Sequence, residues 1–569
     1  MASLNNTYTL FATTSPRTPW LMRADIRLLA DHFVGKEWNR ENQLLFTRMI
    51  GERDEEKGKR LSDGNRDIAA RDRINRSPKK FGFVVLKPTI RLTPAGEALL
   101  ASRRTEEVFL RQFLKYQLPS PYHHQREGGR FRVKPYLELL RLIRHCGTLT
   151  FDEMRLYGMQ LTDYRKFDEV TAMIDDYRKR RAAYKGSYKR FMLNETKEVV
   201  GKIYSEATAR GRTTTRQSGD SSLDNFLATK ARNMKDYADA IFRHLRATGM
   251  VEISQSGHSL SITAERTADV DYILTTIDRE PIAGITEDDY IKYLGDVSIP
   301  LLRSDDKERL RETMREEFPT IPLSEDFTAE QMKEALAEAI EGRKRRLIEQ
   351  RTARIKERQE YDDIMEKFEG IRRGAYYDNA LMMEWNAWRA VTMMDGGEVR
   401  ANIRLDDKGE PLSVAPGNKA DIECDYGRFG VTVEVTLTSG QRQFAAESEP
   451  VPRHVGRLRQ QTGKQTYCLF IAPVINDATI AYFYSLHFTR IDLYGGDTII
   501  VPMELSTFEA MIANTWKAGY TPSPEAVEAF FTRASQAADR CGGGDGWKTW
   551  YRQVTDMACS WPGTRNTEE

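Results

Sequence analysis

The sequence predicts a multidomain α+β protein, and three observations support this fold class. The chain has 569 residues, enough for about four domains at the usual size of roughly 100–200 residues each. Helix-like and strand-like patterns are mixed up to about residue 275, and long helical stretches of mixed charge follow. From about residue 371 strand and helix patterns alternate, which predicts an α/β domain at the carboxyl end.

Composition places the chain outside several classes of protein. No stretch approaches the ~18 consecutive apolar residues of a membrane helix, and the N-terminus lacks the basic and apolar regions of a secretory signal. The five cysteines contain no CxxC pair, which argues against a structural zinc site and favours a reducing compartment. We therefore expect a cytoplasmic protein with no membrane partner. The net charge of only +2 excludes a general polyanion-binding protein.

Residues 1–135 predict a first subdomain of the winged-helix type. Amphipathic helices are expected over 27–33 and 39–50, followed by a two-stranded ribbon over 81–93. A helix then opens at Pro94, where the missing N–H of proline costs no intrahelical bond. Domains of this type commonly place a helix in the major groove of DNA and the ribbon on the backbone.

A basic stretch in this subdomain favours contact with a phosphate backbone. Between residues 66 and 104 there are ten basic side chains and three acidic ones, although a solvated basic surface explains this composition equally well. The candidate DNA contacts combine this stretch with cations from flanking elements. They are Arg17, Arg71, Arg73, Lys79, Lys80, Lys230 and Arg232.

Residues 136–275 predict a second subdomain of the same type. A helix–turn–helix pattern, with Thr150 as the N-cap of its second helix, is followed by a basic helix and then by a hairpin over 250–263. Residues 276–370 are rich in helix formers of both charges. This composition predicts a helical linker that spaces and orients the flanking domains.

Residues 371–569 make up the α/β domain, and its acidic hairpin is the candidate catalytic feature. With a two-residue turn at 426–427, Asp421 lies opposite Thr432 and diagonal to Glu434 on one face of the hairpin. A hairpin one residue longer would separate the two carboxylates onto opposite faces. Crowded carboxylates repel each other unless a cation lies between them, and Mg²⁺ prefers such oxygen ligands. The solvated acids of an ordinary hairpin are the alternative interpretation.

A helix that follows the hairpin is expected to bring further polar side chains to it. Ser448 is its expected N-cap, and Pro450 and Pro452 occupy its first turn, where backbone N–H groups are unpaired. Glu447 then stands at the mouth of this helix, and His454 lies within it. Acids on a hairpin with an acid and a histidine on a helix meet the needs of phosphodiester hydrolysis, in which a metal activates water and a base accepts its proton.

Several stretches follow one another in a recognisable order and spacing. In the α/β domain they are "GNKADIE", "VEVT", "RQFAAESEPVPRH" and "YCLFIAP", and nearer the N-terminus they are "SPRTP", "KKFGFVV", "LTPAG" and "VFLRQFLKYQLPS". Together they resemble the AlwI family of type IIS restriction and nicking endonucleases. The resemblance covers nearly all of the chain except the linker and the C-terminal tail, and the block over 417–454 is its most specific part.

The resemblance implies winged-helix-like DNA-recognition subdomains, a helical linker and a C-terminal nuclease domain of the PD-(D/E)xK class. It also implies an endonuclease that requires Mg²⁺, binds a short asymmetric site in double-stranded DNA and cuts a few bases outside it. By this resemblance Asp421 and Glu434 are metal-binding acids. Glu447, counted as a third metal ligand, and His454 are further active-site residues, and Glu384 is an upstream acid of the same site.

One position departs from the wider nuclease class. The lysine usually found two places after the second acid is Thr436 here, so the metal, Glu447 or His454 must activate the water, and the general base stays unassigned. One active site cuts one strand at a time, so a double-strand break needs a second copy or a small partner subunit. Two alternative functions stay open: a winged-helix DNA-binding regulator without nuclease activity, and a structure-specific repair nuclease.

Overall fold

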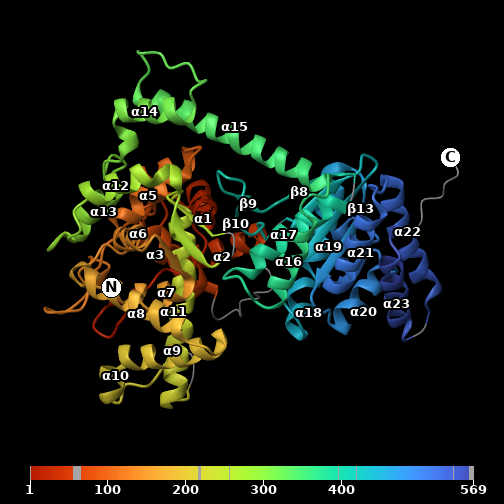
Figure 1. The fold of residues 1–569 in the computed structure, drawn as a ribbon, viewed down its shortest axis with the longest axis horizontal. Helices are drawn as coiled ribbons and strands as arrows, with labels where there is room; N and C mark the ends of the chain where they lie inside the picture. The colour runs from red at the N-terminus through yellow and green to blue at the C-terminus, as the bar shows by residue number, and fades with distance from the viewer. Residues whose placement is uncertain are drawn as a thin grey trace. The chain divides into compact units, whose positions relative to one another are not determined.

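The chain folds into two compact units in the computed structural model, which describes residues 2–54, 66–215, 219–254, 257–394, 396–417, 419–542 and 544–562. Unit 1 comprises Met1–Thr47 and Asp63–Ala339, and unit 2 comprises Arg48–Ser62 and Ile340–Glu569. The division at Ala339 falls inside the long helix α15 (Ala329–Lys356), within the predicted linker (Figure 1). The protein as a whole is a mixed α+β protein that is mostly helical.

Unit 1 is built mainly from helices, with short strands between them. Its helices are α1 (Pro19–His32), α2 (Arg40–Asp54), α3 (Arg66–Lys80), α4 (Pro94–Ala101), α5 (Thr105–Lys115), α6 (Pro135–Cys146), α7 (Phe151–Leu156), α8 (Phe167–Ala183), α9 (Tyr188–Ile203), α10 (Ser205–Ala209), α11 (Leu223–Arg246), α12 (Thr267–Thr276), α13 (Glu287–Gly295) and α14 (Lys307–Glu317). Helix α2 belongs to this unit only as far as Thr47. Its strands are β1 (Ala2–Ser3), β2 (Val84–Val85), β3 (Arg91–Leu92), β4 (His123–His124), β5 (Thr148–Thr150), β6 (Val251–Ile253) and β7 (Ser259–Ile262). Across the described residues of the protein, none of the helices has the length and apolar character needed to cross a bilayer.

The ribbon and helix predicted near Pro94 are present. Strands β2 and β3 pair antiparallel, and Thr93 Oγ1 then caps α4 by accepting from the backbone N–H of Gly96 at 3.1 Å. A Cβ atom on Gly96 would lie 2.1 Å from the carbonyl oxygen of Phe83, so only glycine allows α4 to approach the ribbon this closely.

A second group of elements surrounds a three-stranded antiparallel sheet of order β5-β7-β6. Helix α6 precedes β5, and helices α7 to α11 lie between β5 and β6 in the chain. Thr150 caps α7 as predicted, in a reciprocal capping box with Glu153. The predicted hairpin over 250–263 forms strands β6 and β7, with residues 255–256 of its turn outside the described residues.

The first part of the predicted linker packs into unit 1 and is no free spacer. Tyr290 and Leu294 of α13 are fully buried in a cluster with Tyr122. Their burial was hidden in the sequence because the surrounding residues are strongly charged. Helix α15 begins with a similar attachment, in which Lys333 Nζ pairs with Glu107 and Asp305 at 3.0 and 2.7 Å.

Unit 2 alternates strands and helices around one mixed sheet. Beyond α15, its helices are α16 (Tyr361–Arg372), α17 (Asn379–Met394), α18 (Gln441–Glu447), α19 (Pro450–Thr462), α20 (Asp477–Leu486), α21 (Leu505–Ala518), α22 (Pro524–Arg540) and α23 (Gly546–Cys559). Its strands are β8 (Glu398–Ala401), β9 (Arg404–Leu405), β10 (Pro411–Ser413), β11 (Ile422–Asp425), β12 (Phe429–Val435), β13 (Gln465–Ala472) and β14 (Ile499–Glu504).

The five-stranded sheet has the order β14-β13-β12-β11-β8. The directions of its strands determine which strand ends lie at the same edge. Strands β12, β13 and β14 run parallel, whereas β11 runs antiparallel to β12 and to β8. The carboxyl ends of the three parallel strands therefore lie at the same edge of the sheet as the amino end of β11. In an open α/β sheet, this edge is the usual place for a ligand.

Strand β12 is buried along its whole length, because helices cover both faces of the sheet. On one face Val431 and Val433 join side chains of α17, α21 and α22 in the apolar core. On the other face a Cβ atom at Gly430 would lie 3.4 Å from Leu458 of α19. The predicted division of this strand into an apolar and a polar face is confirmed, and Glu434 lies on the α19 side.

Candidate active site

Two carboxylates are buried side by side at the amino end of β11 and the carboxyl end of β12. Ile422 pairs with Val433, so the same register extended by one residue places Asp421 directly opposite Glu434. The two side chains are 0% and 2% exposed. Directly opposed residues have Cβ atoms about 4.5–5.5 Å apart. Asp421 Oδ2 also accepts from the backbone N–H of Val435 at 2.8 Å, which fixes its orientation across the pair.

The predicted two-residue turn at 426–427 is wrong, because the hairpin loop has four residues. Asp425 pairs with Gly430, and the backbone N–H of Tyr426 donates to the carbonyl of Phe429 at 3.1 Å. Asp425 Oδ1 accepts from Gly427 N at 2.8 Å, Gly427 has φ +80°, and the rings of Tyr426 and Phe429 stack at 4.7 Å. Since the loop is longer by two residues, the carboxylates stay on one face, and Asp421 opposes Glu434 rather than Thr432.

His454 of α19 is held against Glu434. Its Nδ1 lies 2.7 Å from Glu434 Oε1, and its Nε2 lies 3.2 Å from the carbonyl oxygen of Gly417. The imidazole is 2% exposed. Nδ1 faces a carboxylate and Nε2 faces a backbone carbonyl, so both ring nitrogens are directed at protein groups. In this arrangement neither ring nitrogen presents a lone pair to a water molecule.

Glu384 of α17 belongs to the same part of the unit through a shared loop. Its Oε2 accepts from the backbone N–H of Ala415 at 2.8 Å, and the side chain is 6% exposed. Gly417, two residues later, provides the carbonyl that faces His454. The short loop 414–417 thus provides a backbone group to each of these two candidate residues.

Glu447 is buried, but the helix predicted to begin after Ser448 begins two residues later, at Pro450, and follows a separate short helix. Glu447 is the last residue of α18 and is 5% exposed, and Ser448 is the C-cap of α18 instead of the N-cap of a new helix. Helix α19 starts at Pro450, with Glu449 as its N-cap. The Ser448 hydroxyl bonds to the carbonyl oxygen of Phe444 one turn earlier, and this bond explains why it does not cap α19.

Thr436, at the position of the usual lysine, is buried at the end of β12. Its backbone N–H donates to the carbonyl of Ile471 at 3.0 Å, and its hydroxyl accepts from the N–H of Thr438 at 3.1 Å. This neutral side chain is used to shape the chain after the strand.

The donor chemistry of this edge fits a hard divalent cation, although no complete coordination cage is formed. Among the described residues there is no group of three or more His, Cys, Asp or Glu side chains placed to hold a metal ion. Asp421 and Glu434 nevertheless lie directly opposite each other on neighbouring strands, and burial together with both carboxylates raises the pKa of the nearby Cys468 thiol well above its ordinary value. Mg²⁺ commonly binds one or two carboxylates and keeps several waters, so this pair is a sufficient protein contribution.

Other acids of the hairpin lie away from the pair. Asp425, at the far end of β11, is exposed and pairs with Lys464 Nζ at 2.7 Å. Lys464 and the Gly427 N–H bond hold the pKa of this carboxyl below its usual range. The acidic composition of the hairpin therefore contains one buried pair at one end and ordinary surface acids at the other.

Several of the candidate DNA contacts in unit 1 are paired within the protein. Arg17 pairs with Asp236 and Asp239 at 3.2 and 2.9 Å, and its side chain is 40% exposed. Lys79 pairs with Glu287 at 3.4 Å and lies over the ring of Tyr122 at 4.6 Å. Lys80 is half-buried, and burial with the neighbouring Arg76 lowers its pKa to about 8. Arg17 and Lys79 must therefore exchange a protein contact for a DNA contact if they bind phosphate.

Arg73 is placed where it cannot reach DNA in this arrangement. Its Nε lies 2.6 Å from Asp25 Oδ2, and both side chains are buried between α3 and α1. Its helix face looks basic in the sequence because Asp25 is 48 residues away in the chain. We correct this prediction and treat Arg73 as a structural residue. The side chain of Arg71 lies outside the described residues, although its backbone is part of α3.

Lys230 and Arg232 lie on the first half of α11. Lys230 Nζ lies over the rings of Phe226 and Tyr204 at 5.1 and 5.3 Å, and burial lowers its pKa. Arg232 is exposed and bonds through Nη2 to the Thr229 hydroxyl at 3.0 Å. Arg232 is therefore the most accessible of the described candidate cations.

The backbone groups of residues 414–417 were not predicted from the sequence. Ala415 contributes an N–H and Gly417 a carbonyl, and such groups carry no residue-type signal. The only usable sign was the position of this loop directly before the acidic hairpin, within the stretch "VAPG".

One family model and two solved structures are similar to this chain. The family model described as "AlwI restriction endonuclease" matches residues 79–511. Among solved structures, the chain is similar to the small subunit of the heterodimeric restriction endonuclease R.BspD6I, with 21% identity and a TM-score of 0.29, covering 34% of this chain and 97% of that one. It is also similar to the BpuJ1 endonuclease binding domain, solved with pyrene- and phenanthrene-modified DNA, with 14% identity and a TM-score of 0.31, covering 48% of this chain and 92% of that one.

No curated protein matches the chain. The family match covers about three quarters of the sequence and includes all five candidate active-site residues, from Glu384 to His454. The resemblance predicted from "GNKADIE" and the stretches after it is confirmed. The chain belongs to the AlwI restriction endonuclease family.

Proposed function

We propose that this protein is a Mg²⁺-dependent, site-specific DNA endonuclease of the type IIS or nicking kind. Unit 1 reads a short asymmetric site in double-stranded DNA, and unit 2 hydrolyses a phosphodiester bond a few bases outside it. The observation that carries this proposal is the buried pair of Asp421 and Glu434 with His454 bonded to it, in a chain of a restriction endonuclease family. Burying two adjacent carboxylates is costly unless a cation or donors compensate their charge.

The cutting unit is proposed to be of the PD-(D/E)xK class. Support comes from the mixed sheet, in which an antiparallel hairpin ends in Asp421 and Glu434 and is continued by two parallel strands. Asp421 and Glu434 would hold the Mg²⁺, with Glu447 as a further ligand of the metal or of its water. A bound Mg²⁺ would supply Lewis acidity to the phosphate and lower the pKa of the attacking water.

The protein's own residues then prepare the site. Asp421 is oriented by the Val435 N–H, and Glu434 is oriented by His454 Nδ1. Because both ring nitrogens of His454 are engaged with acceptors, we assign His454 to holding Glu434 and compensating negative charge, and not to removing a proton from water. Glu447 is the remaining candidate for accepting that proton.

The reading unit is proposed to contain winged-helix-like subdomains. The order helix α6, strand β5, helices α7 and α11, then strands β6 and β7, with sheet order β5-β7-β6, supports this for the second subdomain. In such a domain the helix before the hairpin is the one that enters the major groove, and here it is α11. Its exposed Arg232 and half-exposed Lys230 are the proposed contacts, together with the half-buried Lys80 and with Arg17 and Lys79 after exchange of their internal partners.

Digestion of a plasmid of known sequence with Mg²⁺, followed by mapping of the DNA ends, tests this proposal. Cuts at a constant offset from one short sequence are expected. Cuts on one strand only would identify a nicking enzyme, and paired cuts would require a second copy or a small partner subunit to supply the other active site.

Other outcomes would contradict the proposal in distinct ways. Cuts without a fixed sequence would favour a structure-specific repair nuclease. A plasmid that is bound at one sequence but stays intact at every Mg²⁺ concentration would favour a winged-helix regulator. The Glu434→Gln variant is the control for a contaminating nuclease, since cleavage that persists in this variant does not come from the proposed site.

A further inference from the structure

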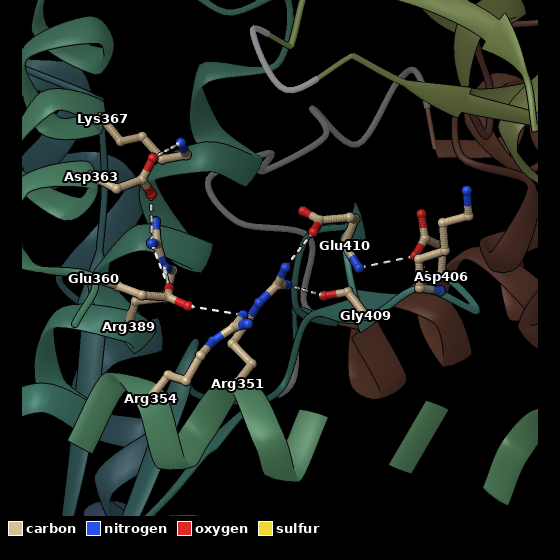
Figure 2. Close-up of polar contacts among 10 residues, drawn as sticks. Arg351, Arg354, Glu360, Asp363, Lys367, Arg389, Asp406, Gly409 and Glu410 are labelled. Carbon is tan, nitrogen blue, oxygen red and sulfur yellow. Dashed lines mark hydrogen bonds and ion pairs between the residues drawn. The ribbon is translucent and has the colours of Figure 1, made fainter. Parts of the chain in front are cut away.

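Helix α15 contacts the turn between β9 and β10 through Arg351. Arg351 Nη1 donates to the carbonyl oxygen of Gly409 at 2.7 Å, and its Nη2 pairs with the Glu410 carboxylate. Figure 2 shows this guanidinium pointing into the turn between β9 and β10. The Arg351 side chain is only 18% exposed, so this contact is more enclosed than an ordinary surface ion pair.

The turn that Arg351 contacts, residues 406–410, is held by hydrogen bonds of its own. Asp406 Oδ1 accepts from the backbone N–H groups of Lys408 and Glu410, both at 2.9 Å, and Asp406 N donates to the Glu410 carbonyl at 2.8 Å. Gly409 has φ +76°, a conformation that favours glycine. Because these bonds hold the turn rigid, a displacement of residues 409–410 also moves strand β10, which follows directly.

The same guanidinium also lies over the ring of Trp385, at 5.6 Å from its centroid. Trp385 directly follows Glu384 in α17, and Arg389 of that helix covers the same ring at 4.5 Å. Arg389 is 2% exposed and pairs with Glu360 and Asp363 of the neighbouring segment at 2.7 and 2.5 Å (Figure 2). Cation–π contacts and enclosed ion pairs thus fix α17 near Glu384.

Arg351 is therefore linked, through the residues it contacts, to both partners of the hydrogen bond between Ala415 and Glu384. On one side the turn leads through β10 (Pro411–Ser413) to Ala415, whose N–H donates to Glu384. On the other side Trp385 is the neighbour of Glu384 itself. Gly417, which faces His454, follows two residues after Ala415. Arg351 touches no candidate active-site residue directly, so any effect it has on cleavage must pass through this loop or through α17.

We propose that Arg351 is a positioning residue through which α15 sets the geometry of the cutting site. By holding the 409–410 turn and Trp385 together, it keeps loop 414–417 where Ala415 bonds Glu384 and Gly417 bonds His454. Cleavage chemistry then depends on the docking of α15, the helix in which the division between the units falls. This inference rests on the proposed nuclease function and adds a route by which the linker controls it.

Single-turnover cleavage by the full-length protein, with saturating Mg²⁺ and excess enzyme over a single-site duplex, tests the proposal. Arg351→Gln removes the charge but keeps most of the side-chain volume, and Glu410→Gln removes the other partner. Each variant is expected to lower the cleavage rate constant by about 10- to 100-fold, the cost of a small misplacement of reacting groups, with DNA affinity unchanged. The double variant is expected to be no slower than the slower single variant, because both remove the same contact.

Two further variants separate positioning from general destabilisation. Arg351→Lys keeps a donor and a charge, and it is expected to restore part of the rate lost in Arg351→Gln. Arg354→Gln, on the same helix, loses a 3.3 Å pair with Glu360 but touches neither the turn nor Trp385, so it is expected to leave the rate unchanged. A merely structural role for Arg351 would lower the amplitude of the single turnover, as less protein folds, and leave the rate constant intact.

The outcomes distinguish this inference from the proposed function. A wild-type protein that cuts, with an Arg351→Gln variant that cuts at the same rate constant, overturns the positioning role alone. Equal losses in Arg354→Gln and Arg351→Gln also overturn it, because the effect would then belong to α15 in general. A wild-type protein that cuts no duplex with Mg²⁺ overturns the proposed function, and the positioning role falls with it.

Discussion

Two buried histidines, one in each unit, show what separates a structural group from a candidate catalytic one. His244 of α11 is 0% exposed, lies 2.5 Å from the Tyr136 hydroxyl through Nδ1, and packs its ring against Phe81 and Phe113. His454 of α19 is 2% exposed, but its partners are the Glu434 carboxylate and the Gly417 carbonyl.

The two residues are equally buried, so burial alone does not identify a functional site. Burial, together with the nearby positive charge of Arg243, lowers the pKa of His244 to about 3. His454 instead faces two acceptors beside a second buried carboxylate, Asp421. The hydrogen-bond partners of a buried histidine, and not its degree of burial, therefore indicate whether its role is structural or catalytic.

The largest expected effect comes from removing the carboxylate partner of His454. Glu434→Gln keeps the shape and one acceptor oxygen but removes the charge that a metal and the imidazole both use. Cleavage is expected to fall on the order of 10³-fold or more, since a metal site supplies several kcal/mol of transition-state stabilisation. Single-turnover cleavage measures this loss, and fluorescence anisotropy with the same duplex should show unchanged binding.

Glu423→Gln is the matched control for this substitution. Glu423 lies on the same hairpin and is half-buried, two residues after Asp421. The Glu423→Gln variant is expected to cut at the wild-type rate. Equal losses in the two variants would mean that the hairpin needs negative charge in general and that Glu434 has no special role.

The second prediction compares the two histidines directly. His454→Ala is expected to slow cleavage by about 10²-fold, at the lower end of what a group that manages charge or protons contributes. His244→Phe is expected to leave the cleavage rate constant intact at a temperature where the variant is folded. A rate constant lowered as much by His244→Phe as by His454→Ala would break the distinction drawn between them.

The third prediction concerns acid stability. Because the folded pKa of His244 is about 3 and its ordinary value is 6.5, the unfolded chain binds a proton below pH 6.5 that the folded chain does not. Stability is therefore lost as pH falls below 6.5, at about 1.4 kcal/mol per pH unit, or about 2 kcal/mol between pH 6.5 and 5. Denaturant unfolding of wild type and His244→Phe should show a smaller acid loss in the variant.

His124→Gln is the control for that measurement. His124 is exposed, so replacing it is expected to leave the acid dependence of unfolding unchanged. An acid dependence that is the same in wild type and in both variants would show that His244 is not held neutral by its surroundings. Restricting the comparison to pH 5 and above keeps most carboxylates ionised in both states.

The smallest expected effect belongs to the reading unit. Arg232→Gln should weaken binding to all sequences and reduce the slope of log affinity against log salt by about one unit, if the guanidinium contacts phosphate. Arg144→Gln, an exposed arginine of the same unit paired with Asp271 at 2.8 Å, is the control. A loss of affinity at a single base pair only would instead assign Arg232 to base reading, and an unchanged salt slope in both variants would remove it from the interface.

Local sequence patterns predicted much of the fold of unit 2 but not the details of its hairpin. The alternation of Val431 and Val433 with Thr432 and Glu434 was enough to assign the two faces of β12. The loop length was not predictable from alternation, because the four-residue loop is selected by the bond from Gly427 to Asp425 and by an aromatic stack. These two contacts depend on particular side chains and cannot be inferred from the alternation of apolar and polar residues.

Long-range pairs account for the other differences. The basic appearance of α3 was misleading for Arg73, since its partner Asp25 comes from another helix. The contacts of Arg351 were invisible for the same reason, as Glu410 and Trp385 are distant in the chain and meet it only after folding. Conversely, the family resemblance identified Glu384, which no periodic pattern marked, and the structure places it beside Ala415 in the loop that also meets His454.

The most direct test of the account is a footprint and a cleavage assay on the same DNA with Asp421→Asn. Asp421 lies directly opposite Glu434, and asparagine keeps its size and the acceptor for the Val435 N–H. We expect a wild-type footprint at the recognition sequence and no cleavage with Mg²⁺. A variant that binds and still cuts at the wild-type rate would contradict the claim that the buried carboxylate pair is the cutting site.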